Sequence, residues 1–294
     1  MRVFVTGANG HIGSAVVPEL VQAGHDVVGL VRSEASAAAV EAMGARTHRG
    51  DLSDLAGLRE AAAEADAVVH LAFDHAAMAA GDFAGAVATD LAVAQTLGEA
   101  LAGTGKALIG VGLTRTGDPK RDAAIDANPR STVARAVAGF TEQGVRSMLV
   151  AIPPVTHSSR DRIGFVPTLI KIARSTGVSG YVGDGANHWP AGHTLDIGRL
   201  FRLALDKAPT GAQLYAATEE GITVREIAEV IGRHLNIPAA SIPADQAAVH
   251  FQGFPFIGLD ITMNNAETRK LLGWEPTHPG LIADLEDGHY FTTR

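Results

Sequence analysis

A glycine-rich turn near the start of the chain constrains its fold more than any other feature. Residues 2–6 form a short, apolar, β-rich run, residues 7–13 read Gly-Ala-Asn-Gly-His-Ile-Gly, and apolar residues then recur at helical spacing. A helix N-terminus that follows such a turn offers N–H groups and a positive dipole end to phosphate oxygens. Gly7 lets the chain reverse, Gly10 leaves room for a pyrophosphate, and Gly13 lets the helix pack closely. The alternative is a glycine-rich turn without a ligand, which the entropic cost of three regularly spaced glycines disfavours.

Strand-like and helical segments alternate through the first half of the chain. This alternation predicts parallel strands with right-handed crossovers, and therefore an α/β fold. We expect a Rossmann-type, doubly wound parallel sheet of about seven strands, with a smaller C-terminal substrate-binding region. The expected strands are residues 2–6, 25–32, 45–50, 66–72, 106–112, 145–152 and 212–217, and the expected helices include residues 34–43, 83–102, 129–144, 165–175, 196–206 and 223–235, with a long polar loop at 113–128.

The composition changes after residue 152, where Pro153-Pro154 interrupts the alternation. We therefore assign residues 1–152 to a dinucleotide-binding Rossmann region and residues 153–294 mainly to a substrate-binding region. Within the second region, roughly residues 194–217 are expected to return to the Rossmann sheet, and residues 180–190 are expected to be irregular because they are rich in glycine.

Composition and charge exclude several classes of protein. The chain has 294 residues, 46% of them hydrophobic, and a formal net charge of −8 without a basic run, which argues against nucleic-acid binding. The absence of cysteine excludes disulfides and thiolate chemistry. Met1 leads directly into the first expected strand, and no apolar run reaches membrane-spanning length. We expect a cytoplasmic protein with a small-molecule substrate and no nucleic-acid or membrane partner; a homodimer is an open alternative to a monomer.

The end of the second expected strand bears on the choice of cofactor. An acid at this position accepts hydrogen bonds from the ribose hydroxyls of NAD, whereas an arginine pairs with the 2′-phosphate of NADP. Val31 occupies the acid position and Arg32 follows it. The sequence therefore favours NADP(H) over NAD(H). Glu34 is a nearby carboxylate that weakens this argument, and the alternative for Arg32 is a solvated loop cation.

The segment from Thr6 to Gly13, Thr-Gly-Ala-Asn-Gly-His-Ile-Gly, resembles the cofactor loop of the extended and atypical short-chain dehydrogenase/reductases. Four further segments carry the resemblance across nearly the whole chain. They are Val-Val-His-Leu-Ala at 68–72, Pro-Pro-Val-Thr-His at 153–157 together with Trp-Pro-Ala-Gly-His-Thr-Leu-Asp at 189–196, and Leu-Leu-Gly-Trp-Glu-Pro at 271–276. The C-terminal half is similar to a bacterial subgroup of NAD-dependent epimerase/dehydratase-like members.

The resemblance implies cofactor contacts along the glycine turn and at the exits of neighbouring strands. The Asp51-Leu52 pair would contact adenine, although Ser53 or Asp54 can instead cap a helix that begins near Leu55. His70 we interpret as a buried core histidine with satisfied hydrogen bonds. The expected cofactor residues are Gly7, Asn9, Gly10, His11, Ile12, Gly13, Arg32, Asp51, Leu52, Leu71, Ala72, Phe73 and Pro153.

Ligands of open α/β sheets bind at the carboxyl ends of the strands. The expected substrate contacts therefore follow the fourth and sixth strands, at Asp74, His75, Pro154, Val155 and His157. The 12 histidines show no His-x-x-x-His spacing, so we expect no metal and interpret His188 and His193 as structural.

The Tyr-x-x-x-Lys pair that usually performs the family's chemistry is absent. The three tyrosines are Tyr181, Tyr215 and Tyr290, and none has a lysine four residues later. Arg130 falls about where the resemblance places the lysine; it could hold the ribose or polarise a carbonyl, but it cannot donate a proton at ordinary pH. Thr114 is the hydroxyl nearest to the usual serine position. We predict that Arg130 and Thr114 are the catalytic residues, with a solvent-facing helix residue and a plain loop residue as the respective alternatives.

These features predict an NADP(H)-dependent oxidoreductase that reduces a carbonyl, imine or activated alkene of a small apolar molecule. Two other functions stay open. One is a non-catalytic NADP-binding sensor, similar to regulatory members that keep the fold and lose the Tyr-Lys pair. The other is an isomerase or cyclase that retains the cofactor. Fold alone does not decide among them.

Overall fold

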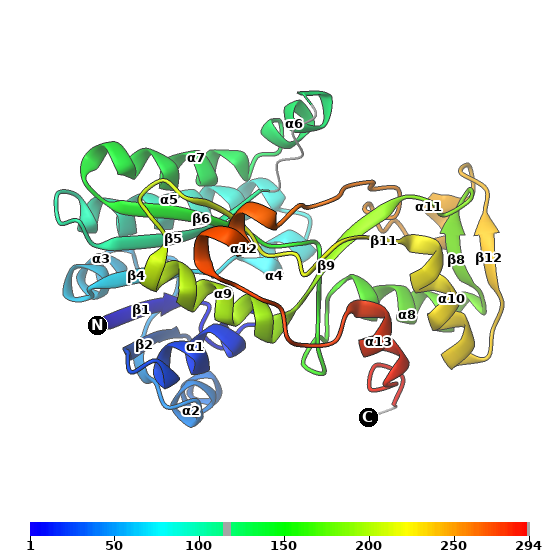
Figure 1. The fold of residues 1–294 in the computed structure, drawn as a ribbon, viewed down its shortest axis with the longest axis horizontal. Helices are drawn as coiled ribbons and strands as arrows, with labels where there is room; N and C mark the ends of the chain where they lie inside the picture. The colour runs from blue at the N-terminus through cyan, green and yellow to red at the C-terminus, as the bar shows by residue number, and fades with distance from the viewer. Residues whose placement is uncertain (114–118, 293–294) are drawn as a thin grey trace. The chain divides into compact units, whose positions relative to one another are not determined.

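The computed structural model describes residues 1–113 and 119–292 (Figure 1). The chain divides into two compact units: a first unit of residues 1–152, 197–216 and 266–275, and a second unit of residues 153–196, 217–265 and 276–294. The expected Rossmann region did not include residues 266–275. This segment joins the first unit because its Trp274 is fully buried in that unit's core.

The first unit is built on a seven-stranded sheet with the strand order β10-β6-β5-β4-β1-β2-β3. Every neighbouring pair is parallel, which confirms the Rossmann-type fold and the expected return of the chain to the sheet. The strand order reverses between β1 and β4, and ligands of such sheets bind at this reversal. The strands are β1 (Arg2–Thr6), β2 (Asp26–Val31), β3 (Arg46–Arg49), β4 (Ala67–His70), β5 (Ala107–Gly112), β6 (Arg146–Ala151) and β10 (Gln213–Tyr215).

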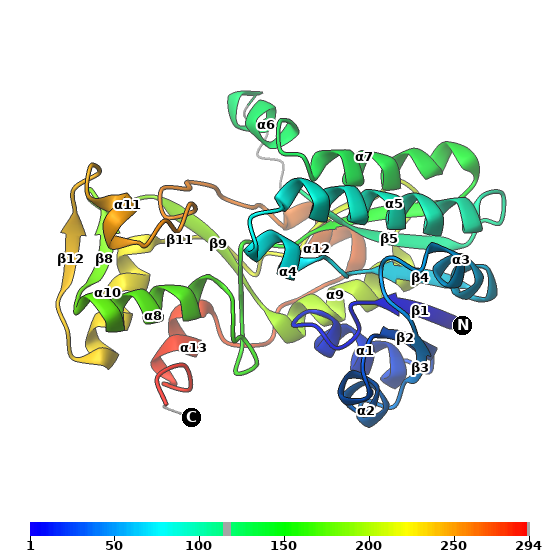
Figure 2. The same cartoon turned by 180° about the vertical axis from the view of Figure 1, so that it is seen from behind.

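Helices cover both faces of this sheet, because alternate strand residues point to opposite sides. Val3 and Val5 of β1 belong to one hydrophobic core and Phe4 belongs to another. Figures 1 and 2 show α1 and α9 along one face and α5 and α7 along the other. The helical segments are α1 (Gly13–Gln22), α2 (Glu34–Ala42), α3 (Leu55–Glu64), α4 (His75–Ala79), α5 (Phe83–Leu101), α6 (Pro119–Asp126), α7 (Ser131–Gly139), the 3-10 turn η1 (Phe140–Gln143), α9 (Thr194–Lys207) and α12 (Ala266–Leu272).

The segment between β5 and β6 differs from the expectation in two ways. Part of the expected loop at 113–128 is helical, as α6. The next helix begins at Ser131 rather than at Pro129, because the Asn128 side-chain oxygen accepts the backbone N–H of Arg130 at 3.0 Å and closes a turn there. Thr114, an expected catalytic residue, lies outside the described residues.

The second unit contains a three-stranded sheet, β11-β9-β7, and a two-stranded sheet, β12-β8. The prediction that residues 180–190 are irregular was partly wrong. The two ends of this stretch are strands, because they pair with segments distant in sequence. Helix α10 begins with a capping box of Thr223 and Glu226, and its apolar face is buried as expected. The elements are β7 (Val155–His157), α8 (Phe165–Thr176), β8 (Ser179–Val182), β9 (His188–His193), β11 (Glu219–Thr223), α10 (Val224–Leu235), β12 (Ala239–Ile242), α11 (Ala247–His250) and α13 (Leu281–Glu286).

Among the described residues, no helix combines the length and the apolar character that crossing a membrane requires.

Candidate functional site

The glycine turn after β1 is open on the side that a diphosphate would occupy. Gly7 has a positive φ of 70°, and a Cβ there would lie 2.8 Å from the backbone nitrogen of Ala72. A Cβ on Gly10 would meet only the Gly7 carbonyl oxygen, at 3.1 Å, so the space beside Gly10 is otherwise open. No side chain caps the start of α1 at Gly13. This open turn with an uncapped helix end fits the diphosphate of a dinucleotide.

The end of β2 carries the expected cofactor-selecting residue. Arg32 is exposed, and the nearby Glu34 forms an ion pair with Arg49 at 2.6 Å. Hydrogen bonds from the Ser53 hydroxyl and backbone hold the pKa of Asp51 below its usual value, and Arg32 adds a smaller electrostatic contribution. Glu34, the carboxylate that weakened the NADP argument, is thus paired with another arginine.

Ser53 and Asp54 were the two candidate caps of the helix that follows the expected adenine-contact pair. Asp54 is the cap, because its side chain accepts the backbone N–H of Gly57 at 3.0 Å. The Asp51 carboxylate instead accepts hydrogen bonds from the backbone N–H and the hydroxyl of Ser53. On the other side of the turn, Asn9 donates a hydrogen bond to the Ser36 hydroxyl at 3.0 Å. These side chains lie within the first unit, around the end of β2 and the exit of β3.

Hydrogen bonds connect the exit of β4 to the end of β1. The Thr6 hydroxyl oxygen accepts the backbone N–H groups of Leu71 and Ala72, both at 3.2 Å. These bonds hold the expected cofactor residues Leu71 and Ala72 against the glycine turn. Of the expected cofactor set, only Pro153 lies in the second unit.

His70 ends β4 and is a satisfied core histidine, as expected. It is 4% exposed, with Nδ1 2.7 Å from the Thr6 hydroxyl and Nε2 2.9 Å from a carboxylate oxygen of Asp90. Asp90, which is buried on α5, was not among the predicted site residues. A signal was present: Asp90 shares helical spacing with the buried apolar residues Val87, Ala94 and Leu97.

The guanidinium of Arg130, at the start of α7, lies against the exit of β4. Its Cζ is 4.4 Å from the centre of the Phe73 ring, and Nη2 is 3.7 Å from Oδ2 of Asp90. Burial lowers the pKa of Arg130, and the charge of Asp90 opposes this shift. With 29% of its side chain exposed, Arg130 is covered rather than solvent-facing. Its catalytic role stays a prediction.

His75 and Asp74 follow Phe73 on the same side of the sheet. The ring of His75 meets that of Phe73 edge-on at 5.2 Å. Partial burial and then the neighbouring Arg130 lower the pKa of His75, which favours its neutral form. Asp74 accepts the N–H groups of Ala76 and Ala77 and thereby caps α4. His75 is exposed, whereas Asp74 caps a helix, and the substrate contacts of both stay predictions.

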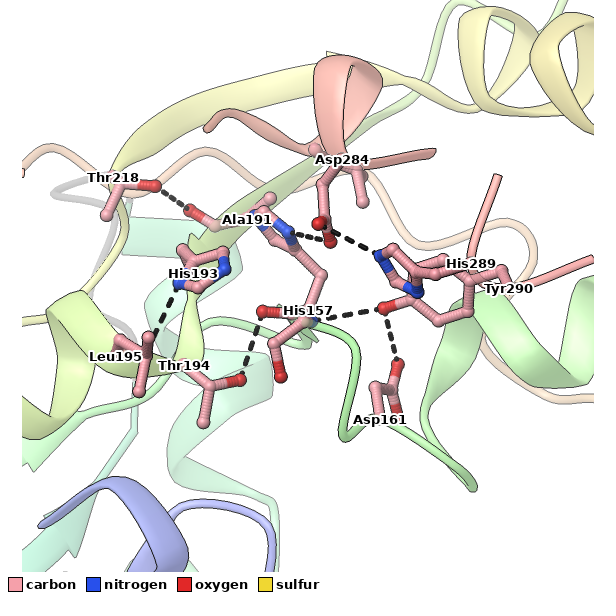
Figure 3. Close-up of polar contacts among 12 residues, drawn as sticks. His157, Asp161, Ala191, His193, Thr194, Leu195, Thr218, Asp284, His289 and Tyr290 are labelled. Carbon is pink, nitrogen blue, oxygen red and sulfur yellow. Dashed lines mark hydrogen bonds and ion pairs between the residues drawn. The ribbon is translucent and has the colours of Figure 1, made fainter. Parts of the chain in front are cut away.

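The expected substrate residues of the second unit are mostly buried. Val155 is 1% exposed, and His157 is fully buried. Nδ1 of His157 lies 2.8 Å from Asp284, which also contacts Nε2 of His289 at 3.0 Å (Figure 3). Burial raises the pKa of Asp284, but hydrogen bonds from both histidines together hold it below its usual value. This network occupies His157 within its own unit, and its substrate contact stays a prediction.

His193, Asp196 and His278 bring their possible ligand atoms within 4.8 Å of one another. The two rings are stacked 4.6 Å apart and only 5° from parallel. A ring nitrogen binds a metal in the plane of its ring, so two stacked rings do not converge on one ion. Asp196 accepts the backbone N–H groups of Thr277 and His278 and thereby holds their turn. Burial, followed by the neighbouring His157 and His278, lowers the pKa of His193 to about 4. We therefore read the cluster as a packing and hydrogen-bonding arrangement.

The three tyrosines lie outside the helices that follow β5. Tyr290 accepts the backbone N–H of Ser158 at 3.2 Å and donates to Asp161 at 3.3 Å, and burial raises its pKa (Figure 3). The Tyr181 hydroxyl accepts a hydrogen bond from Arg225 at 3.2 Å. Tyr215 ends β10. None of the three lies on α6 or α7, where the family's tyrosine is expected.

Comparisons with known proteins agree with this fold. Residues 3–112 match the NAD dependent epimerase/dehydratase family. The chain is 41% identical to the uncharacterized protein C2A9.02 of Schizosaccharomyces pombe, over 99% of this chain and 100% of the relative. It is 26% identical to a 4-hydroxy-2-methyl-3-oxo-4-farnesyl-3,4-dihydroquinoline-1-oxide ketoreductase of Stigmatella aurantiaca, over 93% of this chain and 92% of the relative.

Solved structures of the same architecture cover almost the whole chain. A dTDP-glucose 4,6-dehydratase from Streptomyces venezuelae with bound NAD superposes with a TM-score of 0.75 at 19% identity, covering 98% of this chain and 96% of that one. A UDP-glucose 4-epimerase from Thermotoga maritima gives 0.75 at 18% identity, covering 99% and 98%. The protein thus has the fold of extended short-chain dehydrogenase/reductases, and it belongs to the NAD-dependent epimerase/dehydratase family.

Proposed function

We propose that the protein is an NADP(H)-dependent oxidoreductase that reduces a carbonyl, imine or activated alkene of a small apolar molecule. One observation carries this proposal: the first unit contains both an open glycine turn and Arg130, whose guanidinium lies against the exit of β4. Arg130 falls near the position where the family usually has its catalytic lysine. The ketoreductase among the relatives supports a reductive reaction.

The first unit supplies residues that would hold the cofactor. The turn at 7–13 and the start of α1 would bind the diphosphate, Asp51 and Leu52 would contact the adenine, and residues 71–73 would run beside the nicotinamide half. When bound, NADPH supplies the hydride. The protein's task is then to orient the substrate and to stabilise the negative charge that develops on its oxygen.

Arg130 is suited to that electrostatic task. Together with Asp90 it forms a pair without net charge, so the site can accommodate a neutral carbonyl substrate without holding an uncompensated charge before the reaction. Low solvent exposure strengthens the interaction of the guanidinium with a developing oxyanion. The proton that completes the alcohol comes from water or from another group, because Arg130 does not release one.

Consumption of NADPH with a panel of small carbonyl, imine and activated-alkene compounds tests the proposal. We expect turnover with at least one class, with reduced product formed in equal amount to the NADPH oxidised. Tight NADPH binding without oxidation across the panel would instead indicate a non-catalytic sensor. Substrate conversion without net NADPH consumption would indicate an isomerase or cyclase.

Arg32→Ala is expected to weaken NADPH binding at least several-fold and to leave NADH binding nearly unchanged. The reason is the loss of a charged hydrogen-bond partner for the 2′-phosphate, which typically contributes roughly 1.5–3 kcal/mol. Dissociation constants for both cofactors measure the effect. Arg49→Ala is the matched control, since that arginine on β3 pairs with Glu34. Equal losses for NADPH and NADH would remove the 2′-phosphate argument.

Replacing Tyr181, Tyr215 and Tyr290 by phenylalanine, singly or together, should leave substantial turnover. The hydroxyls of Tyr181 and Tyr290 serve hydrogen bonds inside the second unit, so their loss should mainly lower stability, by about 0.5–1.5 kcal/mol for a typical bond. Steady-state rates and thermal unfolding separate the two effects. Abolished turnover in any folded single variant would show that the site does use a tyrosine.

A further inference from the structure

Asp90 is a buried carboxylate in the middle of an apolar helix. It is 3% exposed, and the neighbouring positions Val87, Ala94 and Leu97 on the same face of α5 are buried and apolar. Taking a carboxylate out of water costs several kcal/mol unless charges and hydrogen bonds compensate it. Asp90 therefore needs defined partners, and the structure provides one at each of its two oxygens.

The hydrogen-bond pattern around His70 favours one tautomer of its ring. The Thr6 hydroxyl oxygen already accepts from the N–H groups of Leu71 and Ala72, so its own hydrogen is directed to Nδ1 of His70 at 2.7 Å. In that tautomer Nε2 of His70 carries the hydrogen and donates it to Oδ1 of Asp90 at 2.9 Å. His70 thus holds the carboxylate through Oδ1 and leaves Oδ2 to face Arg130.

The Oδ2 oxygen faces Arg130, whose Nη2 lies 3.7 Å away. That separation is an ion pair rather than a hydrogen bond. Within the described residues, the guanidinium of Arg130 contacts Asp90 and the face of Phe73, lies near His75, and makes no side-chain hydrogen bond. The Asp90 carboxylate and the Phe73 ring therefore orient the guanidinium and its five N–H donors. The N–H groups on the exposed part of the side chain can donate to a ligand.

We propose that Asp90 is a positioning residue that, held by His70, orients the Arg130 guanidinium over Phe73 so that its free N–H groups meet the substrate oxygen. The proposal rests on the proposed function of Arg130. Asp90 and His70 touch neither substrate nor cofactor in this scheme. They act through Arg130: the carboxylate fixes the direction of the guanidinium and keeps the pair electrically neutral.

Asp90→Asn separates the charge of Asp90 from its shape. The amide oxygen still accepts the hydrogen of His70 Nε2, while the attraction for Arg130 is lost. We expect kcat to fall about three- to tenfold with little change in KM, because contacting charges typically couple by an amount of this order. In an Arg130→Ala background the same change should have no further effect. Glu99→Gln is the control: it removes a carboxylate from the same helix that pairs with Arg59 at the surface, and it should leave kcat unchanged.

Two further measurements test positioning itself. Dilute guanidinium ion should restore part of the activity of Arg130→Ala, and this rescue should be lost when Asp90→Asn is added. In NMR spectra of arginine-labelled protein, the Nε–H signal of Arg130 should exchange with water faster in Asp90→Asn than in wild type, a readout that needs no turnover. If wild type reduces nothing, the proposed function fails, while the NMR comparison still decides the inference. An unchanged Arg130 signal, or an additive loss of kcat in the Arg130→Ala background, would overturn it.

Discussion

Replacing Gly13 by alanine is expected to remove dinucleotide binding. The added Cβ would lie 2.1 Å from the carbonyl oxygen of Gly7 and 2.7 Å from that of Ala8, so the turn must open. Its N–H groups and the start of α1 would then no longer converge on the diphosphate. We expect the affinity for NADPH to fall about 100-fold or more, which corresponds to ~2.8 kcal/mol, measured by titrating the cofactor's fluorescence.

The same substitution elsewhere controls for the effect of a methyl group alone. Gly139 ends α7 in a helical conformation, and an added Cβ there meets no atom within 4 Å. Gly139→Ala should leave NADPH affinity unchanged and stabilise the fold by about 0.4–1 kcal/mol. Wild-type affinity in a folded Gly13→Ala variant, checked by circular dichroism, would mean that the diphosphate does not bind at this turn.

The glycine turn and the parallel sheet were predictable because their signals are local. A strand, three glycines and a helix follow one another within residues 2–22, and the alternation of apolar runs continues to residue 152. The positive φ of Gly7 and the crowding at Gly13 are consequences of that same short segment. Periodicity also located α10, whose apolar stripe is buried against its unit.

The elements that were missed depend on contacts distant in sequence. The ends of the glycine-rich stretch at 180–190 form strands only because β12 and β11 pair with them. Segment 266–275 joins the first unit because Trp274 is buried in its core. No local sequence pattern predicts this burial. Likewise, the stacking of His193 on His278 joins residues 85 positions apart, so spacing along the chain did not reveal their cluster.

The sequence singled out His70 and Arg130 individually but did not predict the contacts that connect them. The resemblance placed Arg130 near the position of the family's lysine, and we interpreted His70 as a buried core histidine. Asp90 connects the two, and it lies 20 positions from His70 and 40 from Arg130 along the chain. Only the packing of α5 between the exit of β4 and the start of α7 brings the three side chains together.

Arg130→Ala is expected to lower kcat at least tenfold, near 1.4 kcal/mol of transition-state stabilisation, and to leave NADPH affinity almost unchanged. The loss could reach about 100-fold, because removing one preorganised donor to an oxyanion has effects of that order. Single-turnover reduction under saturating NADPH measures the step itself. Arg130→Lys keeps the charge but loses the planar fork, so we expect only partial activity.

The control for Arg130 lies on the same helix. Arg135 is exposed on α7, and Arg135→Ala removes an equal charge without touching Phe73 or Asp90. If Arg130 contributes only to the stability of the first unit, Arg130→Ala should lower the unfolding temperature and leave the rate of folded enzyme at the wild-type value. If it stabilises the developing oxyanion, the rate falls while the fold persists, and Arg135→Ala changes neither. Unchanged kinetics in folded Arg130→Ala would therefore reject Arg130 as the group that replaces the missing lysine.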